Sequence, residues 1–238
     1  MSVASAEQYD LLYAQFKDYA RESQLLAELI RSRAPATKTV LDIACGTGEH
    51  ARHLREYGFT VDGVDKEPGC VALARRKNPT GRFLCQDMVK LRVGRTYGAV
   101  VCLFSSIGYV RTEGRLRKAI RRFADHVVEG GIVVVEPWFE PGAMEDGYVV
   151  MHTARDEQMS LCRMSVTRLR GGVSRLEFEY LIGRRGALER RAEVHELGLF
   201  SRAQMLRAFG DSGLAAEYDP AGLCGRGLYV ARKGRRVG

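Results

Sequence analysis

The sequence predicts an α/β fold: a doubly wound, mostly parallel sheet with helices on both faces, into which a smaller antiparallel sheet is inserted. Three observations predict it. Short apolar runs of strand length alternate with stretches of helical spacing over residues 36–136. A glycine-rich turn follows the first of these runs. After residue 138 the pattern changes to long runs of alternating polar and apolar residues, as in a sheet with one face in water.

The first half alternates between strands and helices. Residues 6–34 carry apolar side chains at helical spacing, and Pro35 ends that pattern. We expect strands at residues 39–44, 60–64, 82–85, 99–104 and 132–136. We expect helices at residues 47–57, 68–77 and 114–128, the last of them stopped by Gly130 and Gly131. Because parallel strands need crossover connections, this alternation predicts right-handed strand–helix–strand units.

The second half predicts an antiparallel sheet. Its strands are expected at residues 159–169, 173–182 and 188–200. Gly171 and Gly172 stand between the first two, which is typical of a two-residue hairpin turn. Ser201 then caps a helix that runs to residue 209, and residues 228–231 form a closing strand.

Composition excludes several classes of protein. The chain has 238 residues, a net charge of +8, 45% hydrophobic and 28% charged residues, which is ordinary for a globular protein and not for a disordered one. No apolar run is long enough to span a membrane, and the first residues do not resemble a secretory signal. The six cysteines form no CxxC pair, which favours reduced thiols and a cytoplasmic protein. The basic residues are dispersed without interleaved aromatics, so no nucleic-acid or membrane partner is expected.

The strongest motif lies where the first expected strand ends. Residues 42–48 read Asp-Ile-Ala-Cys-Gly-Thr-Gly, an acid followed by a GxG turn that opens a helix. A glycine turn alone is a weak signal, but Asp65 ends the second strand, where an acid can accept from two ribose hydroxyls. Asp87 and Met88 follow the third strand, where they can contact the edge and face of an adenine. Together, the glycine turn, Asp65, Asp87 and Met88 favour a bound adenosine over a turn with only a structural role. The acidic residues favour a neutral or cationic ligand over a pyrophosphate.

This arrangement resembles the class I S-adenosylmethionine-dependent methyltransferases. The resemblance implies a Rossmann-like fold with a seven-stranded sheet, S-adenosylmethionine as cofactor and S-adenosylhomocysteine as product. It also implies that Asp42, Gly46 and Gly48 line the methionine end of the ligand, while Asp65 holds the ribose and Asp87 the adenine amino group.

A closer resemblance extends over nearly the whole chain. Seven motifs are similar to those of the actinobacterial nucleotide-aminosugar N,N-dimethyltransferases: Tyr9-Asp10, Lys17-Asp18-Tyr19, Phe104-Ser105-Ser106-Ile107-Gly108, Val134-Val135-Glu136-Pro137-Trp138, Gly147-Tyr148-Val149, Leu199-Phe200 and Gly225-Arg226-Gly227-Leu228. That family methylates the amine of deoxyaminosugars attached to thymidine diphosphate. The resemblance implies that residues 1–138 and 201–238 form the S-adenosylmethionine-binding domain, and that residues 139–200 form an antiparallel insertion covering the acceptor pocket.

The chain departs from the family at two positions near the acceptor amine. The family carries a histidine directly after Phe-Ser-Ser-Ile-Gly, where this chain has Tyr109. It also carries a tyrosine eight residues before the Tyr-Asp pair, where this chain has Met1. The acceptor therefore stays open between an aminosugar, a guanidino group and a hydroxyl.

The candidate catalytic residues are Tyr109 and Glu136. A tyrosine with a pKa of about 10 is a poor base near neutrality, so Tyr109 is expected to orient the acceptor amine. Glu136 ends a central strand, where it can take a proton, anchor the acceptor or serve the fold. His50 and His53 share a helix face without a third ligand, so no metal site is expected.

The remaining site residues fall into two sets. The expected cofactor set is Tyr9, Asp42, Ala44, Gly46, Gly48, Asp65, Lys66, Asp87, Met88, Leu103 and Phe104. The expected acceptor set is Tyr13, Lys17, Tyr19, Ser105, Trp138, Phe139, Glu177, Glu179, His195 and Arg226.

The sequence thus predicts a cytoplasmic S-adenosylmethionine-dependent N-methyltransferase of a small-molecule amine, a nucleotide-linked aminosugar in antibiotic biosynthesis, working as a monomer or homodimer. One alternative is methylation of a guanidino group or hydroxyl on another antibiotic precursor. Another is a non-catalytic protein that binds an adenosine ligand and a partner protein. A nucleic-acid methyltransferase is disfavoured, because residues 104–107 stand where such enzymes carry an Asn/Asp-Pro-Pro-aromatic motif.

Overall fold

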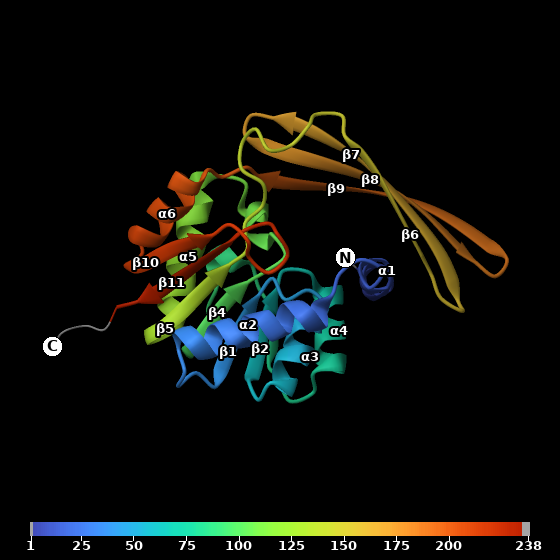
Figure 1. Cartoon of the computed structure of the whole chain (residues 1–238). Helices are drawn as coiled ribbons and strands as arrows, with labels where there is room; N and C mark the ends of the chain where they lie inside the picture. Colours follow the sequence, from blue (N-terminus) through green and yellow to red (C-terminus); the bar gives the residue numbers. More distant parts are fainter. Residues whose placement is uncertain (1, 235–238) are drawn as a thin grey trace.

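A seven-stranded sheet forms the centre of the protein (Figure 1). The computed structural model describes residues 2–234. The strand order is β10-β11-β5-β4-β1-β2-β3, and only the pairs β10–β11 and β11–β5 are antiparallel. Its strands are β1 (Thr39–Ile43), β2 (Thr60–Asp65), β3 (Phe83–Cys85), β4 (Tyr97–Cys102), β5 (Val127–Val135), β10 (Leu214–Asp219) and β11 (Leu228–Lys233). The predicted mostly parallel, seven-stranded sheet is confirmed.

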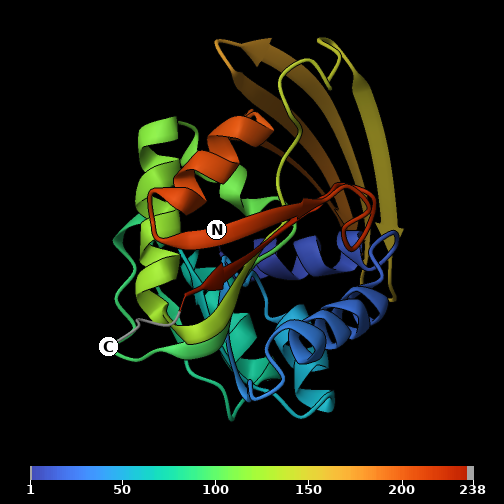
Figure 2. The same cartoon turned by 60° about the vertical axis from the view of Figure 1, so that its left-hand side comes forward.

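Helices cover both faces of this sheet. On one face lie α2 (Tyr19–Arg33), α3 (Glu49–Glu56) and α4 (Pro68–Lys77), and on the other α5 (Glu113–His126) and α6 (Arg202–Gly210) (Figure 2). Successive residues of β1 point to opposite faces of the sheet. Val40 packs toward α2, α3 and α4, and Leu41 packs toward α5 and α6. Because the central strands are buried on both faces, they read as nearly continuous apolar runs.

A four-stranded antiparallel sheet, which we call the insert sheet, lies beyond the core sheet (Figure 1). It consists of β6 (Val149–Arg155), β7 (Met159–Arg170), β8 (Val173–Arg184) and β9 (Ala187–Gly198) in sequence order. Gly171 and Gly172 form the β7–β8 turn with φ of 57° and 77°, as a hairpin of this length requires. The N-terminal helix α1 (Val3–Tyr13) packs against α4 and β6, so it links the two sheets.

Two features of the predicted helices are wrong. The helix expected at residues 6–34 is two helices, because Asp18 caps α2 by accepting from the Arg21 N–H at 2.8 Å. Gly130 and Gly131 do not end α5, which stops at His126. They lie within β5, where Gly130 has φ of 76° and a Cβ on Gly131 would meet the Gly98 carbonyl oxygen at 2.6 Å.

Strands β6 and β10 were not expected from the sequence. β6 is an edge strand that lies mostly exposed, and β10 is an edge strand with only one buried residue, Leu214. Apolar patterning is weak where one face of an edge strand lies in water, which explains both omissions.

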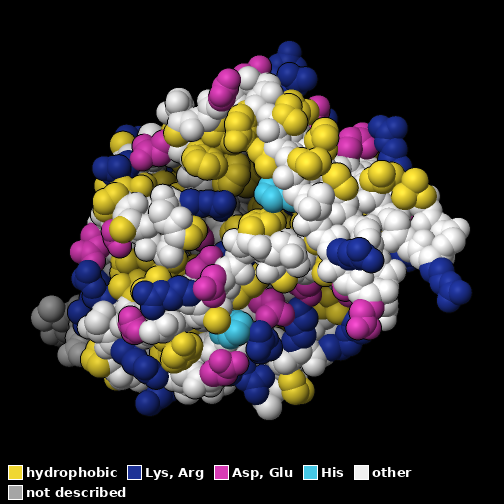
Figure 3. All heavy atoms as spheres, turned by 45° about the vertical axis from the view of Figure 1, so that its right-hand side comes forward, with side chains coloured by type: hydrophobic (Ala, Val, Ile, Leu, Met, Phe, Trp, Pro, Cys, Tyr) yellow, Lys and Arg dark blue, Asp and Glu magenta, His cyan; other side chains and the backbone are white. Residues whose placement is uncertain are grey.

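The surface shows no segregation of charge on the face drawn in Figure 3, where lysine and arginine side chains are interspersed with aspartates and glutamates. Among residues 2–234, none of the helices combines the length and the apolar character needed to cross a lipid bilayer.

Candidate active site

A first cavity of about 750 Å³ opens at the carboxyl ends of the parallel strands. Seven of the residues predicted to bind the cofactor line it: Tyr9, Ala44, Gly46, Asp65, Lys66, Asp87 and Met88. They come from α1, from the loop after β1 and from the ends of β2 and β3. In doubly wound sheets this is where ligands bind, and the volume suits a nucleoside-sized molecule.

The loop after β1 bends through left-handed backbone conformations at Ala44 (φ 57°), Gly46 (φ 55°) and Gly48 (φ 80°). A Cβ on Gly46 would meet nothing within 4 Å, so it would project into open space beside the cavity that this residue lines. A Cβ on Gly48 would meet Asn78 Nδ2 at 2.6 Å. Gly46 therefore leaves room for a ligand, whereas Gly48 lets α4 pack closely and does not line the cavity, contrary to expectation.

Asp65 joins two segments of the cavity wall. One carboxylate oxygen accepts from the Gly46 N–H and the other from the Glu67 N–H, both at 2.9 Å. Burial raises the pKa of Asp65, against the two backbone hydrogen bonds that lower it. Each oxygen retains a lone pair for a further donor, so Asp65 can accept from a diol in the cavity.

Asp42 lies in β1, beneath the cavity rather than in its wall. Its Oδ2 is buried and has no hydrogen-bond partner among the described residues. Burial, with the charge of Asp65 as a second cause, raises the pKa of Asp42 to about 8. An unpaired buried carboxylate favours a positive charge nearby, which is the kind of ligand the acidic loop predicts.

Asp87 accepts from the Val89 N–H at 3.0 Å and pairs with Arg115 of α5 at 3.1 Å. Arg115 and Arg111 also line the first cavity, and the sequence did not identify either. Arg115 lies in the first turn of α5 and Arg111 in the loop before it, both common places for a surface charge, so no local signal distinguishes them.

A second cavity of about 580 Å³ lies between the insert sheet and the core. Eight predicted residues line it: Tyr9, Tyr13, Phe104, Tyr109, Trp138, Phe139, His195 and Arg226. Phe104 was expected at the cofactor but lines only this second cavity. Arg163 of β7 and Arg191 of β9 line it too and were not predicted. Arg163 is 5% exposed, and no carboxylate among residues 2–234 pairs with it. Its guanidinium donates to the Tyr13 hydroxyl at 3.0 Å and lies over the Phe178 ring.

The two cavities share part of their walls. Tyr9, Ser106, Tyr109, Glu193 and His195 line both. The Tyr109 hydroxyl lies 2.6 Å from His195 Nδ1, and burial raises the pKa of Tyr109 well above its ordinary value. A molecule in each cavity would meet at this shared wall, so these side chains can contact both.

Lys17 and Tyr19 do not reach either cavity, although both were predicted to contact the acceptor. Lys17 is buried and donates to Glu22, whose other partner is His50 at 2.9 Å. The Tyr19 ring stacks edge-on against His50. This buried cluster holds the start of α2 against α3, so it serves the fold beneath the site.

Glu136 is fully buried and lines neither cavity, so the predicted catalytic contact is not made. It accepts from the Phe104 N–H at 2.5 Å and from the Cys224 thiol at 2.9 Å. Phe104 and Ser105 have φ of 52° and 59°, a costly conformation for residues with side chains. Glu136 stabilises this bend, which turns the Phe104 ring into the second cavity.

Four more of the predicted ligand contacts are not made, because the side chains are buried elsewhere or point away from the cavities. Leu103 and Ser105 are buried outside both cavities, and the Ser105 hydroxyl donates to the Pro137 carbonyl at 2.7 Å. Glu177 and Glu179 lie on the outer face of the insert sheet, where they pair with Arg175 at 2.9 Å and Arg190 at 3.1 Å. Alternation along β8 predicted one shared face, but that face points away from the cavity.

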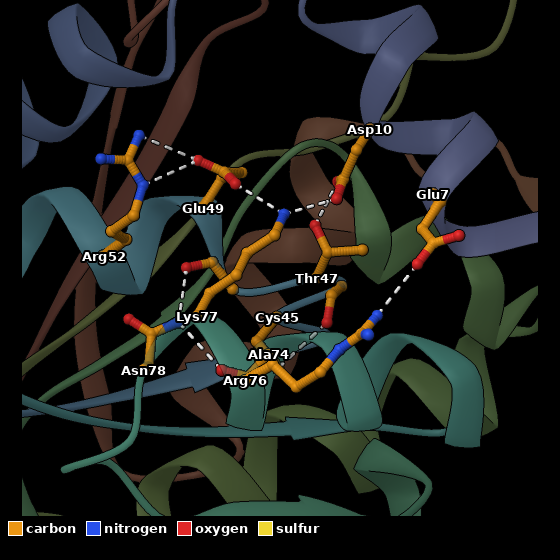
Figure 4. Close-up of polar contacts among 12 residues, drawn as sticks. Glu7, Asp10, Cys45, Thr47, Glu49, Arg52, Ala74, Arg76, Lys77 and Asn78 are labelled. Atoms are coloured by element: carbon orange, nitrogen blue, oxygen red, sulfur yellow. Dashed lines mark hydrogen bonds and ion pairs between the residues drawn. The ribbon is translucent and has the colours of Figure 1, made fainter. Parts of the chain in front are cut away.

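Helix α1 is attached across the first cavity by a set of charged contacts, which we call the α1 latch. Figure 4 shows Lys77 of α4 between Asp10 of α1 and Glu49 of α3, with Thr47 also on Asp10. The Lys77–Glu49 contact is 2.6 Å long. Because Tyr9 precedes Asp10 and lines both cavities, the latch sets the position of a wall residue.

Comparison with known sequences agrees with this geometry. A family profile described as a methyltransferase domain matches residues 40–131. The chain is 40% identical over 233 residues to the dTDP-3-amino-3,6-dideoxy-alpha-D-glucopyranose N,N-dimethyltransferase of Streptomyces fradiae. That match covers 97% of this chain and 91% of the relative.

Solved structures are similar over the same extent. The crystal structure of DesVI from Streptomyces venezuelae superposes with a TM-score of 0.91 at 36% identity, covering 97% of this chain and 98% of that one. The S-adenosylmethionine-bound structure of CalS10, an amino pentose methyltransferase of Micromonospora echinaspora involved in calicheamicin biosynthesis, has a TM-score of 0.85 at 32% identity, covering 94% and 95%. Because each match covers nearly the whole chain, the likeness includes the insert sheet.

Proposed function

This chain belongs to the S-adenosylmethionine-dependent methyltransferases, in the family of dTDP-aminosugar N,N-dimethyltransferases, and from that membership we propose that it methylates the amine of a sugar joined to a nucleoside diphosphate. One observation carries the proposal: a cavity lined by the strand-end carboxylates Asp65 and Asp87, and a second cavity lined by two arginines without acidic partners among the described residues, share the wall that contains Tyr9 and Tyr109.

The first cavity fits the cofactor. Asp65 has free lone pairs for the ribose hydroxyls, and Asp87 keeps acceptor capacity for an adenine amino group. The space beside Gly46 accepts the methionine end, and the unpaired carboxyl group of Asp42, which ionises when a positive charge lies beside it, suits its positive groups. We assign these roles as a set, because they come from three neighbouring strand ends.

The second cavity suits an acceptor that carries phosphates. Arg163, Arg191 and Arg226 line it, and Glu145 and Glu193 are the acids that accompany them in its wall. Arg191 already pairs with Glu193 at 3.3 Å, whereas Arg163 and Arg226 have no acidic partner among the described residues. Two guanidinium groups without counter-ions favour a diphosphate, which their fork-shaped donors match well.

The same charges disfavour a guanidino acceptor. A cationic substrate would be repelled by the arginines, and Glu177 and Glu179 of the expected acceptor set point away from the cavity. The mass-spectrometry test below distinguishes a hydroxyl acceptor from an amine.

Methyl transfer requires the protein mainly to position the two reactants. S-adenosylmethionine, when bound, supplies a methyl group on a cationic sulfur that leaves as a neutral thioether. The chain's own residues then hold the acceptor nitrogen at the shared wall and exclude water. Such positioning can contribute about 7–11 kcal/mol to lowering the barrier. The Trp138 and Phe139 rings and the insert sheet above them provide the apolar cover.

The sugar itself is set by the acceptor cavity. The Streptomyces fradiae relative is named for a 3-amino-3,6-dideoxy hexose and CalS10 for an amino pentose, so the sugar differs within the family. We propose a deoxyaminosugar on thymidine diphosphate and two successive methyl transfers. None of the six cysteines forms a disulfide, which supports a cytoplasmic location, and a monomer or homodimer without nucleic acid or membrane completes the proposal.

Mass spectrometry tests the proposal directly. The protein is incubated with S-adenosylmethionine and each of four acceptors: a thymidine diphosphate 3-aminosugar, its 4-amino isomer, the same nucleotide sugar with a hydroxyl in place of the amine, and a guanidino metabolite. We expect one and then two methyl groups on an aminosugar. Methylation of only the hydroxyl or only the guanidine would contradict the proposal.

A further inference from the structure

Tyr109, His195 and Glu193 form a chain of polar contacts in the wall that the two cavities share. The Tyr109 hydroxyl lies 2.6 Å from His195 Nδ1, and His195 Nε2 lies 3.4 Å from Glu193 Oε2. The residues come from η2 (Ser106–Val110) and from β9, so two elements far apart in the chain meet here. The mechanism as derived above uses none of these contacts.

With the His195 imidazole taken as neutral, the contacts favour one arrangement of protons. Hydrogen bonding to His195 and the charge of Arg191 hold the pKa of Glu193 below its usual value, against the effect of burial, so Glu193 is ionised. An ionised carboxylate accepts from Nε2–H, which leaves Nδ1 of a neutral imidazole as an acceptor. Tyr109 then donates its O–H to Nδ1, and its oxygen keeps lone pairs for a donor in the cavities.

Tyrosines, two acids and two cations surround the pair. The charged and titratable groups that face Tyr109 and His195 are Tyr9 and Tyr13 from α1, Asp65 from β2, Lys66 after it, Tyr180 from β8, and Glu193 and Arg191 from β9. The Phe178 ring packs against the imidazole with 4.9 Å between ring centres. An imidazolium formed here would have Glu193 as its counter-ion.

We propose that His195 and Glu193 are positioning residues for methyl transfer: they aim the Tyr109 oxygen at the acceptor amine, and His195 takes the proton that this amine loses. This inference rests on the proposed function. When the N–CH₃ bond forms, the nitrogen becomes a cationic ammonium. An N–H bond of that ammonium then breaks, its proton goes to the Tyr109 oxygen, and the former Tyr109 proton goes to His195 Nδ1. The imidazolium next to Glu193 later releases a proton to water.

We call this proton transfer through Tyr109 to His195 the relay, and it prepares the nitrogen for a second methylation. The first transfer leaves the nitrogen protonated, and a protonated nitrogen has no lone pair for the second. Tyr109 stays neutral throughout, because its ionisation is strongly disfavoured in this buried place. Proton uptake by a neighbouring imidazole restores the nucleophile while the acceptor stays bound and the cofactor is exchanged.

Kinetics on variants with dTDP-3-amino-3,6-dideoxy-α-D-glucopyranose as probe test the inference. Tyr109→Phe removes the hydroxyl, and His195→Asn keeps an acceptor near Nδ1 but cannot take a proton. We expect each to lower kcat by about 10- to 100-fold while the affinity for S-adenosylhomocysteine stays unchanged. The double variant should be no slower than Tyr109→Phe, since His195 acts through Tyr109. Glu189→Gln, on the same strand and exposed, is the matched control with unchanged kcat.

Three further readouts separate this role from a structural one. kcat of the wild type should fall as the pH is lowered, because a protonated His195 takes no further proton, and His195→Asn should lose this dependence. Imidazole in the buffer should raise kcat of His195→Ala and leave Tyr109→Phe unaffected. With S-adenosylmethionine in excess over the acceptor, His195→Asn should accumulate monomethylated product that the wild type carries on to the dimethylated one. Calorimetric binding of S-adenosylhomocysteine shows that each variant is folded.

The outcomes distinguish the two proposals. If the wild type methylates the probe but the two substitutions act additively, or the pH profile and imidazole response do not change, the relay is wrong and the proposed function stands. If the wild type binds S-adenosylhomocysteine and methylates no aminosugar nucleotide, the proposed function is wrong and the relay falls with it.

Discussion

The carboxylate of Asp65, at the end of β2, accepts a hydrogen bond from the backbone N–H of Gly46, 2.9 Å away in the loop after β1. Its second oxygen accepts from the Glu67 N–H. The two bonds hold the carboxylate in one orientation at the floor of the first cavity. A preorganised acceptor binds a diol without a further loss of side-chain freedom.

Asp65→Asn should weaken binding of S-adenosylhomocysteine. Asparagine keeps the shape but has one acceptor oxygen instead of two and no charge. A hydrogen bond to a charged group contributes about 1.5–3 kcal/mol, so we expect affinity to fall about 10- to 100-fold by calorimetry. Asp211→Asn, on the exposed end of α6, is the control. Equal affinity in the two variants would refute the ribose assignment.

Binding of S-adenosylmethionine should release a proton from Asp42. Its pKa of about 8 in the ligand-free protein falls when a positive charge binds nearby, because the ionised carboxylate is then favoured. Affinity therefore rises with pH up to about 8 and levels off above it. Calorimetry in two buffers with different heats of ionisation measures the proton, and identical apparent enthalpies would exclude this linkage.

The raised pKa of Asp42 makes the ligand-free protein less stable as the pH rises, whereas the affinity for S-adenosylmethionine increases. Because its folded-state pKa lies above the ordinary value of 3.8, the folded protein holds a proton that the unfolded chain has lost. The free energy of unfolding of the ligand-free protein should therefore fall as pH rises from about 4 to about 8. In Asp42→Asn that loss should be smaller by about 1–3 kcal/mol, as urea unfolding at several pH values would measure.

Arg163→Met should separate acceptor binding from folding. We expect KM for the aminosugar nucleotide to rise about 10- to 100-fold, since a charge-assisted hydrogen bond to phosphate is lost. The free energy of unfolding should stay equal or increase slightly, because a buried cation without a counter-ion is replaced by an apolar side chain. Arg168→Met, at an exposed position on the same strand, should change neither quantity. Loss of S-adenosylhomocysteine binding in Arg163→Met would contradict the separation.

Lys77→Met should loosen the α1 latch. Lys77 is three-quarters buried between Asp10 and Glu49, so its removal leaves two acids facing each other (Figure 4). Hydrogen exchange in residues 3–13 should become faster, and S-adenosylhomocysteine should dissociate about 5- to 10-fold faster, equivalent to about 1 kcal/mol. Arg76→Met removes the exposed contact with Glu7 next to it and should have little effect. Equal changes in both variants would mean that the latch has no special role.

Sequence reasoning succeeded where the signal is local. The alternation of strands and helices, the Ser201 cap and the glycine hairpin each depend on neighbouring residues, and all are present in the structure. It failed at the 6–34 helix, because the interruption depends on Asp18 capping α2 and on Lys17 turning inward to Glu22. Patterning also could not tell which face of β8 is covered, so Glu177 and Glu179 were assigned to the wrong side.

Residues that reach a cavity from distant elements could not be predicted. Arg163 sits in an alternating strand whose charges read as solvent-exposed, yet α1 and the loops after β4 and β5 cover that position. Glu136, in contrast, was expected to reach the crevice and lines neither cavity. Its place at a strand end pointed to the crevice, but the bend at Phe104 needed an acceptor, and the side chain turned inward to supply it.

From the residue order alone follow the fold class, the glycine bend and the carboxylates that end successive strands, because parallel strands bring their carboxyl ends to one edge whatever the rest of the chain does. The acceptor side was decided only when the insert sheet packed over the core. Tyr109 and His195 are 86 positions apart, and only the register of β9 against η2 brings them to 2.6 Å. Short-range periodicity holds no information about such a contact, since it depends on long-range packing that many sequences with the same pattern would not share.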